Sequence, residues 1–155
     1  MNKLLLPTFA LCAVLALPFA RAQSAQAGAP AASAPVDDAL FRALGGQAGI
    51  DAIVADFVPR LAADPHTSEF FKKTNRAHFE LMLSQKFCVV AGGPCVYTGK
   101  SPKEAHRDMD ISLSDFNAVV EVLQASMDAQ HVPFATQNQL LARLAPMHRD
   151  IVSVH

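Results

Sequence analysis

Residues 87–106, FCVVAGGPCVYTGKSPKEAH, join the end of one amphipathic helix to a short helix that carries a histidine. The Gly-Gly-Pro at residues 92–94 ends the first helix, because glycine and proline are helix terminators. Residues 95–101 predict an extended loop, and residues 102–108 predict a short helix bearing His106. This order of helix, loop and histidine-bearing helix decides which fold the rest of the chain can form.

Helical periodicity extends through the chain from Asp37 onward, and no segment alternates between apolar and polar residues as a strand does. Ser112 and Thr136 are each followed three residues later by an acidic or amide side chain, which is the pattern of a capping box. Pro59 lies inside a predicted helix and should bend it. The sequence therefore predicts an all-α fold. Helices are predicted at residues 37–44, 48–62, 64–71, 76–90, 102–108, 112–127 and 136–151.

The first 36 residues differ in composition from the rest. The apolar run LLLPTFALCAVLALPFA at residues 4–20 follows Lys3 and precedes the small-x-small pattern at residues 20–22, so we expect residues 1–22 to be a secretory signal peptide. A membrane anchor is the alternative, but the run is shorter than the roughly 20 residues that span a bilayer. Residues 23–36 predict a flexible linker, which leaves residues 37–155 as the folded domain.

Charge excludes several partners. The chain has 13 Lys and Arg residues against 14 Asp and Glu residues, and the basic residues are scattered. A nucleic-acid partner is not expected, nor is stable membrane association once the signal peptide is removed. We expect an exported protein of the periplasm.

Two cysteines remain in the expected mature domain. Six residues separate Cys88 from Cys95, so a disulfide could join them in an oxidising compartment. They could equally be unrelated thiols, because Cys88 falls on an apolar helix face where free cysteine is common. Their spacing is not that of a CxxC zinc knuckle, and the chain has no CxxCH site for covalent haem.

Histidine is the main chemical resource of the sequence, with six residues. His106 follows a long loop and lies among helices rich in Phe, Met, Leu and Val. This arrangement suits a non-covalently held haem, because imidazole supplies the axial bond and apolar helix faces bury the macrocycle. For His106 alone, a surface position is the alternative.

An ordered set of motifs then resembles the group I truncated haemoglobins over residues 39–152. The resemblance implies a two-over-two helical sandwich around one haem b per chain. The motifs are Leu44-Gly45-Gly46, Gly49-Ile50, Asp56-Phe57, Ala63-Asp64-Pro65, Phe70-Phe71, Thr74-Asn75, Gly92-Gly93-Pro94, Tyr97-Thr98-Gly99 and Lys103-Glu104-Ala105-His106.

The resemblance also assigns roles to individual residues. His106 matches the proximal iron ligand, and Phe71 matches the phenylalanine that wedges against the porphyrin. Lys103 is a candidate for a propionate contact or a solvated lysine, and Tyr97 matches an aromatic residue near the haem edge or packs within its loop. The positions expected to line the haem faces are Phe79, Leu83, Phe87, Ile111, Phe116 and Val119.

The distal side departs from the family pattern. Where family members often place tyrosine and glutamine, this chain has Val58, Phe79 and Leu83. Each hydrogen-bond donor lost from dioxygen is worth about 1 kcal/mol, so we expect fast oxygen release. Met82 stands one position before Leu83 and is either a sixth iron ligand or a core methionine. His78 is expected at the surface, and as a sixth ligand it would need a shift of helix register or a kink to reach the iron.

We therefore expect a haem protein that reversibly binds a diatomic gas (dioxygen, nitric oxide or carbon monoxide) in an apolar pocket. One alternative is a haem enzyme, either a nitric-oxide dioxygenase or a peroxidase-like protein. Another is a six-coordinate electron-transfer protein, for which a reductase or other redox partner is expected.

Overall fold

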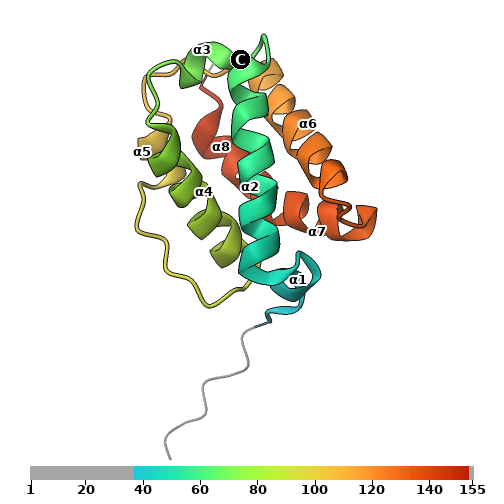
Figure 1. The fold of residues 1–155 in the computed structure, drawn as a ribbon. Helices are drawn as coiled ribbons and strands as arrows, with labels where there is room; N and C mark the ends of the chain where they lie inside the picture. The colour runs from blue at the N-terminus through green and yellow to red at the C-terminus, as the bar shows by residue number, and fades with distance from the viewer. Residues whose placement is uncertain (1–36, 154–155) are drawn as a thin grey trace, which may run out of the picture. The chain divides into compact units, whose positions relative to one another are not determined.

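The computed structural model describes residues 37–153, which form an all-helical domain (Figure 1). This described part contains no β-strand, which confirms the predicted fold class. The predicted signal peptide (1–22) and linker (23–36) lie outside the described residues. Between residues 37 and 153, no helix combines the length and apolar character needed to cross a bilayer. The elements are α1 (Ala39–Ala43), α2 (Gly46–Ala63), α3 (Ser68–Phe71), α4 (Arg76–Val90), α5 (Pro102–Ala105), α6 (Leu113–Ala129), α7 (Phe134–Leu144), the 3₁₀ helix η1 (Ala145–Met147) and α8 (His148–Ile151).

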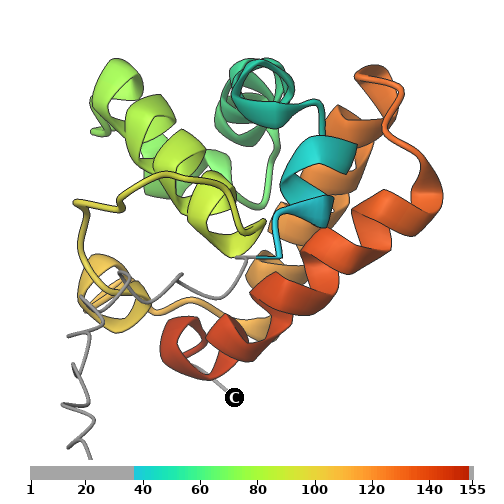
Figure 2. The same ribbon diagram turned by 90° about the horizontal axis from the view of Figure 1, so that it is seen from below.

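Two pairs of helices form two layers over a shared core (Figure 2). In one layer α2 packs against α4, in the other α6 packs against α7, and α2 also packs against α6 between the layers. Burying each large apolar side chain contributes about 1.5–3 kcal/mol, so this core is the main source of stability. The core consists of Leu40, Leu44, Ile50, Ile53, Val54, Phe57, Val58, Leu61, Phe87, Cys88, Ala91, Leu123, Met127 and Leu140.

The turn from α1 to α2 depends on glycine. Gly45 and Gly46 have φ angles of 87° and 67°, a left-handed conformation that favours glycine. A Cβ atom on Gly49 would lie 1.9 Å from the carbonyl oxygen of Leu44, so only glycine allows α2 to pass this close to the end of α1. The pair ends the first helix as predicted, and α2 then continues through Pro59 to Ala63.

Helix α4 has the predicted bounds at both ends. The Asn75 side chain accepts a hydrogen bond of 3.0 Å from the His78 backbone N–H, which caps the start. At the other end Gly92, with φ of 85°, turns the chain. The Phe41 N–H donates to the Ala91 carbonyl at 3.1 Å, and the Arg143 guanidinium donates to the Val90 carbonyl at 3.1 Å. The end of α4 is thereby tied to α1 and α7.

Two short helices are smaller than predicted. Asp64 begins a turn, in which its side chain accepts from the N–H groups of His66 and Thr67, but α3 starts only at Ser68. Helix α5 ends at Ala105 rather than at Asp108. The reason is backbone conformation, because His106 at the cap already leaves the helical region with φ of −108° and ψ of 11°, and Asp108 then turns left-handed with φ of 62°.

The prediction of one last helix over residues 136–151 is wrong in two respects: the helix starts earlier, and it is interrupted before residue 151. Its start lies at Phe134, with Pro133 at the cap, and the carbonyl of Pro133 accepts from the N–H groups of Thr136 and Gln137. Thr136 is therefore buried inside the helix and does not cap it. The α-helix ends at Leu144, and a 3₁₀ turn that contains Pro146 leads into α8.

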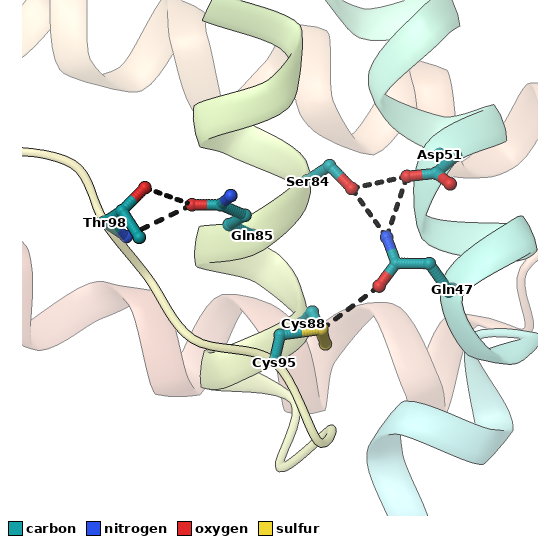
Figure 3. Close-up of a disulfide and its surroundings, with 7 residues drawn as sticks. All are labelled: Gln47, Asp51, Ser84, Gln85, Cys88, Cys95 and Thr98. Atoms are coloured by element: carbon teal, nitrogen blue, oxygen red, sulfur yellow. Dashed lines mark hydrogen bonds between the residues drawn. A yellow bond between two sulfur atoms is a disulfide. The ribbon is translucent and has the colours of Figure 1, made fainter.

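The cysteine pair forms a disulfide, which settles the two possibilities left open by the sequence (Figure 3). The two Cα atoms lie 5.9 Å apart, because the turn after α4 brings Cys95 back beside Cys88. The bond anchors the segment between α4 and α5, residues 91–101, which we call the α4–α5 loop.

Candidate functional site

Helix α5 is held by a capping box that begins one residue before it. The Ser101 side chain accepts a hydrogen bond of 3.3 Å from the Glu104 N–H, and the Glu104 carboxylate accepts one of 3.1 Å from the Ser101 N–H. The Ser101 hydroxyl also donates to this carboxylate and is the main cause that lowers the Glu104 pKa. Pro102 occupies the first helical position, where its missing N–H costs nothing. His106 is thus presented at the end of a well-defined helical turn.

The His106 ring has one nitrogen engaged by the backbone. Its Nδ1 lies 2.7 Å from the carbonyl oxygen of Pro102. A carbonyl can only accept, so Nδ1 carries the proton, and in the neutral ring Nε2 holds a free lone pair. Metal-binding histidines in proteins have this arrangement, because a bond to the second nitrogen fixes the tautomer and orients the ring. The half-buried imidazole can therefore bind a metal ion through the lone pair of Nε2.

The side of the site around His106 is assembled from three helices. Helix α5 packs against α8, and His148 of α8 meets the ring of Phe116 on α6 edge to face, with ring centroids 5.0 Å apart. Ile111 is buried outside the main core, and its carbonyl accepts from the Ser153 N–H at 3.0 Å. Val119 is half-buried against the core. We call Ile111, Phe116, Val119 and His148 the proximal group.

Several residues predicted for the haem site lie together between α2, α3 and α4. The rings of Phe71 and Phe79 lie 5.1 Å apart, and both side chains line a cavity together with Val58. Val58 is 6% exposed, whereas Phe71, Phe79 and Leu83 remain half-buried at the margin of the core. We call these four residues the distal group. The structure therefore brings together Val58 and Phe79, which the sequence predicted for the distal pocket, and Phe71, which it predicted to contact the porphyrin, while their contact with haem stays a prediction.

This distal cavity has a volume of about 60 Å³. A water molecule needs about 10–15 Å³ on the same measure, so the cavity has room for a diatomic molecule. Its wall also contains Thr74 and Arg76, for which the sequence predicted no role at the site. Arg76 is the first residue of α4, and its guanidinium pairs with Glu80 at 2.8 Å. A helix-start arginine gives no distinctive sequence signal, although the Thr-Asn before it marks the cap.

Other predicted site residues lie elsewhere. Phe87 is 4% exposed and packs on Phe57 in the core, with ring centroids 6.3 Å apart. Met82 is half-buried on α4, while His78 at the start of α4 and Lys103 on α5 are exposed. Contact of any of these residues with a cofactor stays a prediction.

Tyr97 lies in the α4–α5 loop and packs against residues near it in the sequence and on α4. Its hydroxyl donates to the Lys100 carbonyl at 2.8 Å, and the Lys86 ammonium stands 4.1 Å from the ring centroid. Burial raises the Tyr97 pKa. In this structure the residue is part of the loop packing that precedes α5.

The chemistry of the donor set fits haem. Among residues 37–153, no group of three or more His, Cys, Asp or Glu side chains is arranged to hold a metal ion by itself. His106 offers a single imidazole nitrogen, and the half-buried proximal and distal residues around the site are mostly apolar. Haem needs this combination, since the porphyrin supplies four iron ligands and the protein supplies an axial nitrogen and apolar faces.

Comparison with known proteins gives the same fold and family. The family model described as "Bacterial-like globin" matches residues 39–153. A group 1 truncated haemoglobin of Tetrahymena thermophila is 36% identical over 88 residues, which is 57% of this chain and 73% of that protein. A group 1 truncated haemoglobin of Mycolicibacterium paratuberculosis is 29% identical over 114 residues, 74% of this chain and 84% of that protein.

Solved structures agree. The crystal structure of the truncated haemoglobin from Tetrahymena pyriformis in its Fe(III) form superposes with a TM-score of 0.72 at 28% identity, covering 74% of this chain and 97% of that one. This likeness confirms the two-over-two sandwich formed by the α2–α4 and α6–α7 pairs. The chain belongs to the bacterial-like globins, as a group 1 truncated haemoglobin that binds haem.

Proposed function

We propose that the chain holds one haem b through Nε2 of His106 and reversibly binds a diatomic gas on the opposite, distal face. The observation that carries this proposal is the hydrogen bond of 2.7 Å between His106 Nδ1 and the Pro102 carbonyl. With Nδ1 protonated, the lone pair of Nε2 is free to bind iron, and the ring is half-buried at the end of α5. The proximal group supports the proposal, because its three apolar side chains, Ile111, Phe116 and Val119, would pack on one haem face.

Haem held by His106 would supply an iron centre that can bind a diatomic gas. The protein controls what reaches the iron. Phe71 and Phe79 line the cavity together with Val58, and their apolar side chains favour a small uncharged ligand over water. Arg76 lies at the wall of this cavity, but its guanidinium forms an ion pair with Glu80 one turn further along α4.

An apolar distal face selects among the three gases. Dioxygen gains partial negative charge on binding and depends on hydrogen-bond donors to stay bound, whereas carbon monoxide depends on them less. Val58, Phe79 and Leu83 offer no donor, and the Arg76 guanidinium at the cavity wall is paired with Glu80, so we expect dioxygen to leave quickly. Rapid release disfavours nitric-oxide dioxygenase turnover, and the absence of an acid or base among the three apolar residues disfavours peroxidase-like turnover.

We further propose that the protein works outside the cytoplasm, in the periplasm. The signal-peptide pattern of residues 1–22 supports this location. The Cys88–Cys95 disulfide supports it as well, because disulfides persist mainly in oxidising compartments.

Absorption spectra of the purified protein in the ferric and ferrous states test the proposal. We expect one haem per chain and a five-coordinate ferrous spectrum that changes on addition of carbon monoxide. A low-spin ferrous spectrum without added gas would favour a sixth ligand such as Met82 and an electron-transfer role. No haem uptake at all would overturn the proposal.

A further inference from the structure

The two sulfurs of the Cys88–Cys95 disulfide have different surroundings. Cys88 is fully buried in the last two turns of α4, whereas Cys95 is half-buried in the α4–α5 loop beside the exposed Val96. An external thiolate can approach only the more accessible sulfur. Attack on this disulfide is therefore directed at Cys95.

A side-chain amide faces Cys95 from α2 (Figure 3). Gln47 Nε2 donates to Asp51 at 2.8 Å and to the Ser84 hydroxyl at 2.6 Å. Because the Asp51 carboxylate can only accept, the amide nitrogen must face Asp51, and the amide oxygen is then fixed toward Cys95. Gln47 Oε1 lies 3.1 Å from Cys95 Sγ.

This contact has a different meaning in the two redox states. A disulfide sulfur has no hydrogen to donate, so the oxidised protein gains no hydrogen bond from Gln47. A Cys95 thiol would donate to Gln47 Oε1 without any movement of the amide. Cys88 would become a buried free thiol in an apolar core, an environment in which reduced cysteine is common. The fold accommodates the dithiol as well as the disulfide.

We propose that Cys88–Cys95 is a redox-active pair that a dithiol reductant opens at Cys95. The thiolate of the reductant attacks Cys95 Sγ, and the Cys88 thiolate leaves and takes up a proton. The second thiolate of the reductant then attacks the first reductant sulfur, which is bonded to Cys95 in the mixed disulfide. Cys95 is released as a thiol, and the reductant departs as a cyclic disulfide. Two electrons and two protons pass from the reductant to the protein.

Opening the pair changes how the loop that leads to His106 is held. In the oxidised state the loop is attached to α4 covalently at Cys88 and non-covalently one turn earlier, where Gln85 Oε1 accepts from the N–H and the hydroxyl of Thr98 at 3.1 Å each. Helix α5 itself packs against α8. After reduction the Gln85 and Lys86 contacts hold the loop on α4, so the spacing between α4 and His106 is less constrained.

A thiol titration tests the redox pair independently of haem. The full-length protein is equilibrated with dithiothreitol at defined ratios of its reduced and oxidised forms, and free thiols are labelled and counted by mass. Gln47→Leu removes the acceptor and should shift the equilibrium about fivefold toward the disulfide. Ser84→Ala is the matched control, since Asp51 still orients the amide, and should shift it much less. Equal equilibria for wild type and Gln47→Leu would contradict the role of Gln47.

Haem release tests the consequence, which rests on the proposed function. Transfer of haem from the loaded protein to an apoglobin acceptor should be faster after reduction, because only the Gln85 and Lys86 contacts then hold the α4–α5 loop on α4. Cys95→Ser should be fast with or without reductant, and Gln85→Ala should enlarge the effect of reduction. Failure to bind haem in either redox state would overturn the proposed function, whereas haem that binds and leaves at the same rate in both states would overturn the redox coupling alone.

Discussion

The carbonyl oxygen of Pro102 and Nδ1 of His106 lie 2.7 Å apart, within a single turn at the end of α5. The same proline carbonyl accepts the backbone N–H of His106 at 3.1 Å. One acceptor therefore fixes both the end of the helix and the tautomer of the ring. The orientation of Nε2 follows from the backbone of α5, which Ser101 and Glu104 cap.

His106→Ala should abolish stable haem binding. Loss of a hydrogen bond behind a metal ligand costs 10–100-fold in affinity, so loss of the ligand itself should cost at least about 100-fold. Haem content per chain, measured from the pyridine haemochrome spectrum, checks this. His78→Ala on the exposed start of α4 is the control and should retain haem. Unchanged haem content in His106→Ala would mean that another residue binds the iron.

Leu83→Gln should slow dioxygen dissociation about fivefold, because it adds one hydrogen-bond donor worth about 1 kcal/mol to the distal group. Stopped-flow displacement by carbon monoxide measures the rate. Leu81→Gln makes the same change at a residue of α4 that is 53% exposed, and it should leave the rate unaltered. A slow rate already in the wild type would reveal a donor in the pocket, and Arg76 is the first to test.

Met82→Leu should leave the ferrous and ferric spectra unchanged. The half-buried Met82 lies on α4 beside Leu83, where a thioether packs as well as a leucine side chain does. Conversion of a low-spin wild-type spectrum to a high-spin one by this substitution would show that Met82 binds the iron.

Gly49→Ala should destabilise the fold by about 2–3 kcal/mol, because its Cβ would meet the Leu44 backbone and force α1 and α2 apart. Chemical denaturation monitored by circular dichroism checks this. The reverse exchange, Ala52→Gly on the exposed face of α2, should cost only about 1 kcal/mol through helix propensity. If both variants lower the free energy of unfolding by the same amount, α1 can shift away from Gly49 with little loss of stability.

Acid should weaken the start of α5. The Ser101 hydroxyl is the first cause that holds the Glu104 pKa below its ordinary value of 4.5. A lowered folded-state pKa stabilises the fold above pH 4.5, and this stabilisation is lost as the pH falls through the folded-state value. Glu104→Gln should therefore lower Tm at neutral pH, and its difference from wild type should shrink below pH 4.5. A constant difference across this range would contradict the assignment.

The sequence predicted best where a local signal is complete. Helix α4 has an Asn75 cap at one end and Gly92 at the other, and both predicted bounds are correct. For helix α7 the local signals conflict. The Thr136 capping-box pattern predicts a start at Thr136, but the helix begins at Phe134, directly after Pro133. The turn at Asp108 depends on a left-handed residue other than glycine, which composition does not reveal.

The candidate site was predictable only in part, for a similar reason. His106 and Phe71 belong to motifs that keep their order along the chain, whereas Val58 and Phe79 stand where the chain departs from the family pattern. The disulfide stayed open because its formation depends on the direction of the turn at Gly92. The contribution of Arg76 to the cavity and of His148 to the proximal group is a matter of tertiary packing between distant segments.

The packing of α5 against α8 also constrains when the site can form during synthesis. The support for His106 comes from residues 148–151, more than forty positions later in the chain. A nascent chain that has emerged only as far as α6 contains His106, the proposed iron ligand, but not the helix on which α5 rests. Tight haem capture should therefore follow synthesis of α8.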